Sequence, residues 1–282
     1  MPTVTSRDGT NIAYETLGAG EPLMLVDGAM CYRGSGPMRE LAERLQGQFR
    51  VVIYDRRGRG ESGDTQPYEV AREVEDIEAL LAALGGSAHL YGCSSGGVLA
   101  LEAASRLEGV KSLMIYEAPF IVDGSRDPMT DGKMAEMDRL VASGRRSEAV
   151  KLFMRFVGVP GFFLAIMPLM KVWKKLTAIA HTLPYDLAIV GPYQRGQPLP
   201  DGKWSGVASP VLVADGGKSP AWMRNGAAAL AAHLGAGYRT LPGQTHMVKA
   251  DAQVPVMVEF FGGAAASGNA ASSGSEAAIP AG

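Results

Sequence analysis

The sequence has few of the features that direct a protein to an oxidising compartment or to nucleic acid. Its 282 residues include only two cysteines, Cys31 and Cys93, which are too few for a disulfide framework and fit a reducing compartment. The 27 basic and 29 acidic residues give a formal net charge of -2, so the basic excess typical of nucleic-acid binders is missing. No apolar run lies near the start, so we expect no signal peptide. These absences favour a cytoplasmic location and no nucleic-acid partner.

A long hydrophobic run is also missing. The largely apolar stretch 157–170 (VGVPGFFLAIMPLM) is shorter than the ~20 residues that span a bilayer, and Pro160 and Pro168 interrupt it. We therefore expect no stable membrane insertion. A pair of helices lining an apolar pocket is the favoured interpretation, and a helix lying on a membrane surface is the alternative.

Sequence motifs for common cofactors are missing as well. The chain has no H-E-x-x-H motif, no paired C-x-x-C motifs and no P-loop. We therefore expect no metal, no nucleotide and no other cofactor. The expected partner is a small-molecule substrate, and the oligomeric state stays open.

The residues that are present predict a globular α/β protein. The chain is 46% hydrophobic and 20% charged, which is enough to form a sizeable core. Short apolar runs, typical of strands buried on both faces of a parallel sheet, alternate with helical patterns. Asp8-Gly9 marks a turn between two further strands. The expected strands cover residues 2–7, 11–17, 23–26, 51–54, 88–91, 112–116 and 211–214, and the expected core helices cover 68–84, 96–107 and 221–234.

The alternation of strands and helices stops between residues 119 and 205. Helical patterns occur there at 133–143, 146–157 and 170–182, without a convincing strand. We expect a helical cap (119–205) over the carboxyl edge of the sheet, where α/β proteins bind their ligands. The core would then comprise residues 1–118 and 206–262. Residues 263–282 are small and polar, which predicts a disordered tail.

The strongest chemical signal is a G-x-S-x-G motif formed by Gly92, Ser94 and Gly96. It lies between a strand-like run and a helix-like run, which is the context of a nucleophile elbow. The glycines leave room for a tight turn that projects the Ser94 hydroxyl, and the helix start brings backbone N–H groups close to the reacting oxygen. Cys93 and Ser95 lack the flanking glycines, so Ser94 is the expected nucleophile.

A second glycine-rich motif follows the strand expected at 51–54. Gly58, Gly60 and Gly63 match the G-x-G-x-x-G pattern of dinucleotide-binding loops. In such loops the glycines open a helix directly, whereas residues 64–67 intervene here and the loop carries three arginines. We therefore do not interpret this motif as a nucleotide site.

Together these motifs resemble those of the α/β-hydrolase fold superfamily, with a helical cap as in its esterase, haloperoxidase and epoxide-hydrolase-like branches. The superfamily's D-x-R-G-x-G-x-S loop, which the resemblance implies is structural, is matched by Asp55, Arg57, Gly58, Gly60 and Ser62. The resemblance covers about residues 3–261. It implies a mainly parallel eight-stranded sheet flanked by helices, with an inserted helical cap. Members that open epoxides or displace halide through an ester intermediate use Asp as nucleophile, so Ser94 indicates acyl transfer.

The catalytic base is expected to be a histidine late in the chain, because these enzymes follow the order Ser, acid, His. His246 lies in a loop after a strand-like run, where the resemblance places the base. The other histidines fit less well: His89 lies within an expected strand, His181 lies in the cap, and His233 ends an expected helix.

The catalytic acid departs from the superfamily's pattern. The resemblance implies an Asp after the seventh strand, but the matching position holds Ser219. Three carboxylates remain as candidates. Glu117 follows the strand expected at 112–116 and is favoured; Asp215 and Asp123 are the alternatives.

The resemblance also implies an oxyanion hole after the third strand. There the superfamily usually carries His-Gly, and this chain carries Asp27-Gly28. The backbone N–H groups of Ala29 and Ser95 are the expected oxyanion donors. The sequence assigns no role to Asp27.

These features predict a serine hydrolase that cleaves an ester, thioester or lactone of a small, partly apolar substrate through an acyl-enzyme. Two alternatives stay open. The first is another serine-triad reaction on the same fold, by a perhydrolase, a C–C bond hydrolase or a lyase. The second is a non-catalytic ligand-binding protein. The apolar side chains expected to line the pocket are Phe156, Phe162, Phe163, Met167, Met170 and Trp173.

Overall fold

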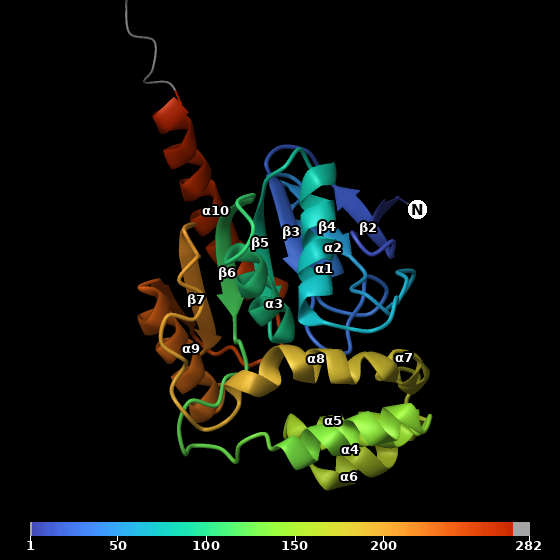
Figure 1. The fold of residues 1–282 in the computed structure, drawn as a ribbon. Helices are drawn as coiled ribbons and strands as arrows, with labels where there is room; N and C mark the ends of the chain where they lie inside the picture. Colours follow the sequence, from blue (N-terminus) through green and yellow to red (C-terminus); the bar gives the residue numbers. More distant parts are fainter. Residues whose placement is uncertain (1, 273–282) are drawn as a thin grey trace, which may run out of the picture.

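Eight strands form one sheet in the order β1-β2-β4-β3-β5-β6-β7-β8 (Figure 1). The computed structural model describes residues 2–272. Only the pairs β1–β2 and β2–β4 are antiparallel, and the other neighbouring strands are parallel. The mainly parallel sheet is thereby confirmed. The strands are β1 (Thr3–Thr5), β2 (Asn11–Leu17), β3 (Pro22–Val26), β4 (Arg50–Tyr54), β5 (Ala88–Cys93), β6 (Val110–Tyr116), β7 (Val211–Gly216) and β8 (Gly237–Leu241).

Helices cover both faces of this sheet, which explains why its central strands are apolar throughout. Every residue of β3 and β5 is buried. The helices α2 (Val70–Ala83), α3 (Ser95–Ala104) and α9 (Ala221–Leu234) contribute side chains to the core on one face. The helices α1 (Met38–Leu45) and α10 (Ala250–Ser272) contribute to the core on the other face. The expected helices 68–84, 96–107 and 221–234 correspond to α2, α3 and α9.

A helical layer lies beyond the carboxyl ends of the strands, at the bottom of Figure 1. It is inserted between β6 and β7, and within residues 117–210 the structure has no strand. Ten buried side chains of this layer, among them Trp173 and Leu187, form a core together with Met30 of the segment after β3. Its α-helices are α4 (Asp131–Ala142), α5 (Arg146–Phe156), α6 (Gly161–Ile166), α7 (Trp173–Ala178) and α8 (Leu183–Val190), with 3-10 turns at Met167–Leu169, Ala180–Thr182 and Gly191–Tyr193.

Helix α8 lies directly against the ends of the strands, and α4, α5 and α6 lie farther from the sheet (Figure 1). Six of its eight residues are buried. A helix buried on most sides carries no 3.6-residue polar stripe, and this explains why its pattern does not stand out in the sequence.

The end of the chain differs from expectation. Helix α10 continues to Ser272, so residues 263–272, expected to belong to a disordered tail, are helical. Alanines in this stretch favour a helix. The rest of the expected tail, 273–282, lies outside the described residues. Within residues 2–272, no helix combines the length and the apolarity needed to cross a bilayer.

Candidate active site

Ser94 occupies a sharp bend between β5 and α3. Its backbone has φ 54° and ψ -129°, a conformation that non-glycine residues rarely adopt and that costs of the order of 1–3 kcal/mol. The N–H of Ser94 donates to the carbonyl of Tyr116 at 2.9 Å, which ties the bend to β6. Cys93 and Ser95 are buried on either side, whereas Ser94 is partly exposed. The bend therefore presents one hydroxyl group.

The glycines around Ser94 allow backbone to approach backbone. A Cβ atom on Gly92 would lie 2.5 Å from the carbonyl oxygen of Gly96. A Cβ atom on Gly96 would lie 2.3 Å from the carbonyl oxygen of Val26. A Cβ atom on Gly28 would lie 3.1 Å from the Cβ of Ser94, so the turn after β3 runs directly beside the serine. Any side chain at Gly92 or Gly96 would push this bend apart.

Glu117 and His246 form the contact that distinguishes among the candidate acids. The Oε2 atom of Glu117 lies 2.8 Å from Nδ1 of His246, and its Oε1 accepts the N–H of Gly216 at 2.7 Å. Glu117 is fully buried and follows β6 with φ 50°. The hydroxyl of Tyr116 donates to the carbonyl of Thr245 at 2.6 Å and fixes the loop that carries the histidine. The carboxylate is thus held by the backbone of β7 while it orients the imidazole.

The alternative acids have other partners. Asp215 is buried at the end of β7, and its Oδ2 accepts the hydroxyl of Tyr238 at 2.6 Å. Asp123 accepts hydrogen bonds from Ser125 and from Asn225. Ser219 is buried, and its hydroxyl has no partner among the described residues. Of the three candidate carboxylates, the structure brings only Glu117 to His246.

The other three histidines lie elsewhere in the fold. His89 is buried and its Nδ1 lies 2.8 Å from the hydroxyl of Ser112; burial lowers its pKa. His181 lies 3.7 Å from a carboxylate oxygen of Asp64. The Nε2 atom of His233 lies 2.8 Å from the backbone carbonyl oxygen of Lys203, which does not line the cavity. His246 is the one that shares a cavity with Ser94.

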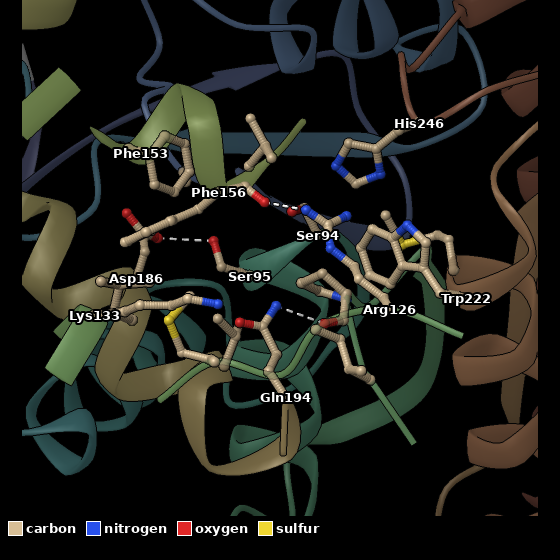
Figure 2. A pocket seen from close by; sticks show the side chains of 18 of the residues that line it. Ser94, Ser95, Arg126, Lys133, Phe153, Phe156, Asp186, Gln194, Trp222 and His246 are labelled. Carbon is tan, nitrogen blue, oxygen red and sulfur yellow. Dashed lines mark hydrogen bonds between the residues drawn. The ribbon is translucent and has the colours of Figure 1, made fainter. Parts of the chain in front are cut away.

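This cavity has a volume of about 420 Å³, within the range of small-molecule sites. Ala29, Ser94, Ser95 and His246 all line it, and Figure 2 shows the imidazole at the same end as Ser94. The backbone N–H of Ser95 belongs to the first turn of α3, where N–H groups have no acceptor within the helix. The expected nucleophile, base and oxyanion donors thus surround one space.

The expected pocket wall needs correction. Of the six apolar side chains expected there, only Phe156 lines the cavity. Phe162, Phe163 and Met170 are exposed on the outside of the cap, and Trp173 and Met167 belong to the cap's own core. Apolarity in the sequence does not tell which face of a cap helix points inward. The side chains that the sequence did not indicate include Arg126, Lys133, Phe153, Gln194 and Trp222.

The arginine-rich loop after β4 contacts two parts of the cavity wall, the helix α8 and the turn after β3. Arg56 and Arg59 are buried and both bind Asp186 of α8, with N–O distances of 2.8 and 2.7 Å. Arg59 also donates to the carbonyl of Gly28 at 2.7 Å, and Asp186 accepts the hydroxyl of Ser95 at 2.8 Å. The cap is therefore bound by ion pairs to the loop after β4, and by a hydrogen bond to the residue that follows the candidate nucleophile. Asp186 was not identified from the sequence, although its position as the one charged residue of an apolar helix is a signal that could have indicated a role in the site.

Asp27 is buried at the start of the turn after β3 that carries the expected oxyanion donor Ala29. Its Oδ1 has no hydrogen-bond partner among the described residues, and burial raises its pKa to about 7 although Arg59 and Arg56 oppose this. Its carboxyl group lies close to Gly36, whose added Cβ would stand 3.1 Å from Oδ2. The charge of Asp27 is thus largely suppressed below neutral pH.

The described residues 2–272 contain no cluster of three or more His, Cys, Asp or Glu that could hold a metal ion. In the G-x-G-x-x-G loop, the N–H of Gly58 donates to the carbonyl of Gly63, and the next helix begins only at Val70. The loop therefore does not open a helix toward a phosphate group.

Comparison with known proteins agrees with this architecture. The model of the alpha/beta hydrolase family matches residues 20–254, most of the chain. The chain belongs to the alpha/beta hydrolase family. Among solved structures, this alpha/beta hydrolase is similar to one from Sphaerobacter thermophilus, with a TM-score of 0.84, 46% identity, and coverage of 92% of this chain and 100% of that chain. An esterase from Thermogutta terrifontis has a TM-score of 0.68 at 20% identity, covers 93% of this chain and 98% of its own, and shows the fold alone.

Curated relatives match a shorter segment of this alpha/beta hydrolase. A protein of Azorhizobium caulinodans, named provisionally as the carbamate hydrolase RutD, is 34% identical over 127 residues. That segment covers 44% of this chain and 47% of the relative. The chain thus matches about half the length of this relative.

Proposed function

We propose that this protein is a cofactor-independent serine hydrolase. It would cleave an ester, thioester or lactone bond of a small, partly apolar substrate through an acyl-enzyme. One observation carries the proposal: Glu117 lies 2.8 Å from Nδ1 of His246, and His246 shares a cavity with a strained, partly exposed Ser94. Membership of a hydrolase family and the hydrolase names of its relatives support the same reaction class.

Proton transfer begins at His246. Glu117 holds the proton on Nδ1, so Nε2 is the unprotonated nitrogen that can accept a proton from Ser94. The Ser94 oxygen then attacks the carbonyl carbon of the substrate, and the carbonyl oxygen becomes an oxyanion. The N–H groups of Ser95 and Ala29 would donate to this oxyanion, and each such donor is worth ~3 kcal/mol of barrier.

The reaction is completed in three further proton transfers. The imidazolium gives its proton to the leaving alcohol or thiol, and the acyl group stays on Ser94. Water then donates a proton to His246 and attacks the acyl carbon, and the collapse of that intermediate returns the proton to Ser94. The surroundings of the cavity, including Phe153 and Phe156, suit an apolar part of the substrate.

A fluorophosphonate probe tests the proposal directly. We expect the probe to label Ser94 in the folded protein, and p-nitrophenyl ester hydrolysis to disappear in Ser94→Ala. Ser105→Ala, at the opposite end of the same helix, is the matched control and should keep both properties. No labelling of the folded wild type, or hydrolysis that survives Ser94→Ala, would refute the proposal.

The same labelling experiment bears on the alternatives. If the probe labels Ser94 but the protein hydrolyses no ester, thioester or lactone, the protein would catalyse another serine-triad reaction. A protein that binds a small molecule without labelling or turnover would be a non-catalytic binder. We also propose a cytoplasmic location, supported by the two unpaired cysteines.

A further inference from the structure

Arg126 occupies a prominent position in the cavity wall. It belongs to the segment between β6 and α4, and its guanidinium carbon stands 4.2 Å from the ring centroid of Trp222. It donates one hydrogen bond to the carbonyl of Phe156. Figure 2 shows Arg126 between Trp222 and Phe156, at the end of the cavity that holds Ser94.

The guanidinium has more donors than this contact uses. A guanidinium carries five N–H donors in a planar fork that fits two carboxylate oxygens at once. Within residues 2–272, no carboxylate lies within ion-pair distance of Arg126, although the exposed Asp127, its neighbour in the chain, also lines the cavity. The side chain is half-buried, and burial lowers its pKa because water no longer solvates the charge fully.

Besides Arg126, the charged side chains of the cavity wall are Lys133, Arg155, Asp127 and Asp186; three cations against two carboxylates leave the wall positive. Asp186 faces the cavity, but Arg56 and Arg59 neutralise it from behind. Lys133 also lines the cavity, and its ammonium group donates to a backbone carbonyl rather than to a carboxylate. A cationic wall with a planar fork, stacked on an aromatic ring, is suited to a carboxylate.

We infer that Arg126 is the binding site for a carboxylate group of the substrate, so that the enzyme prefers esters that carry a free carboxylate. This inference rests on the proposed function, because it places the carboxylate relative to the bond that Ser94 attacks. Stacking on Trp222 and the bond to Phe156 hold the guanidinium in place before the substrate arrives. Lys133 adds attraction from the same cavity.

Two pairs of esters test this preference from both sides of the scissile bond. The first pair is 4-nitrophenyl hydrogen glutarate and its methyl ester, and the second is 4-(butanoyloxy)benzoate and its methyl ester. In at least one pair we expect kcat/KM of the wild type to be at least ~10-fold higher for the acid. Arg126→Gln should lower kcat/KM for that acid by ~10- to 100-fold and change it by less than ~3-fold for the methyl ester.

Two further variants separate a direct contact from a general effect of charge. Arg224→Gln removes an exposed cation from α9, the helix that carries Trp222, and should keep the preference. Arg126→Lys keeps the charge but loses the planar fork, so it should keep only part of the preference. The inference is overturned if neither pair shows a preference, or if the preference survives in Arg126→Gln while the methyl esters are still hydrolysed.

A binding measurement keeps this inference distinct from the proposed function. If the wild type hydrolyses none of the esters and takes no fluorophosphonate, the proposed function fails. Binding of glutarate and of glutaramide to wild type and Arg126→Gln, measured by calorimetry, then decides. Tighter binding of glutarate that Arg126→Gln weakens at least ~10-fold supports the carboxylate site, and equal binding in the two proteins overturns it.

Discussion

Replacing Glu117 by Gln tests the orientation of the candidate base. Both carboxylate oxygens are in use: Oε1 accepts the N–H of Gly216 at 2.7 Å, and Oε2 contacts Nδ1 of His246 at 2.8 Å. A Gln side chain has one oxygen and one NH₂ group. If its oxygen keeps the bond to Gly216, its NH₂ faces Nδ1, which must then be the unprotonated nitrogen.

The proton of the imidazole consequently moves to Nε2 in Glu117→Gln. A protonated Nε2 cannot accept the proton of Ser94, so the nucleophile is no longer activated. The corresponding exchange of Asp for Asn in a related triad lowers kcat by ~10⁴. We expect kcat for p-nitrophenyl esters to fall by ~10³- to 10⁴-fold, which corresponds to about 4–5 kcal/mol of activation free energy.

Asp215→Asn is the matched control for this experiment. Asp215 is also a buried carboxylate at the end of a neighbouring strand, but its bond goes to the hydroxyl of Tyr238. An amide oxygen can accept that hydroxyl, so kcat should change by less than about 3-fold. The reasoning is refuted if Glu117→Gln stays within about tenfold of wild type, or if Asp215→Asn loses as much activity as Glu117→Gln.

Three further predictions concern the framework of the site. Asp186→Asn leaves two buried guanidinium groups without their shared carboxylate, and it should lower the free energy of unfolding by ~3 kcal/mol or more in urea titration; a loss below about 1 kcal/mol would contradict this. Gly96→Ala should destabilise the fold and abolish hydrolysis, because its Cβ would lie 2.3 Å from a carbonyl oxygen, whereas Gly262→Ala in α10, with open space around it, should be neutral or stabilising by up to ~1 kcal/mol in the same titration. Asp27 keeps its proton to about pH 7 in the folded state but releases it near pH 4 when unfolded, so stability should fall with rising pH across that window; Asp27→Asn should remove this loss of at most ~4 kcal/mol, and parallel pH profiles of the two proteins would count against it.

Local patterns were sufficient to predict the sheet and the bend at Ser94. Strands such as β3 are continuous apolar runs, and the G-x-S-x-G motif can be recognised within five residues, although Gly96 is also required by its contact with the carbonyl of Val26. The catalytic acid could not be predicted in this way, because the sequence contains three carboxylates at positions where an acid could lie. Only the tertiary contact between Glu117 and His246, 129 residues apart, distinguishes them.

The cavity wall was the least predictable part of the site. Phe162 and Phe163 are as apolar as Phe153, yet they are exposed and Phe153 lines the cavity. The packing of short cap helices decides which side faces inward, and that packing leaves no clear periodicity in helices of six residues. Trp222 lies outside the cap, on α9, and joins the wall only after folding.

The ion pairs between Asp186 and the loop after β4 divide the inserted layer into two parts that are attached to the rest of the protein in different ways. Ion pairs hold helix α8 to the sheet, whereas α4, α5 and α7 contribute mainly apolar side chains to the core of the cap. We therefore expect that the cap helices before α8 can be replaced by those of a relative without loss of these ion pairs. A chimera that replaces residues 130–180 with the corresponding helices of a relative retains them, whereas one whose junction falls after α8 loses them.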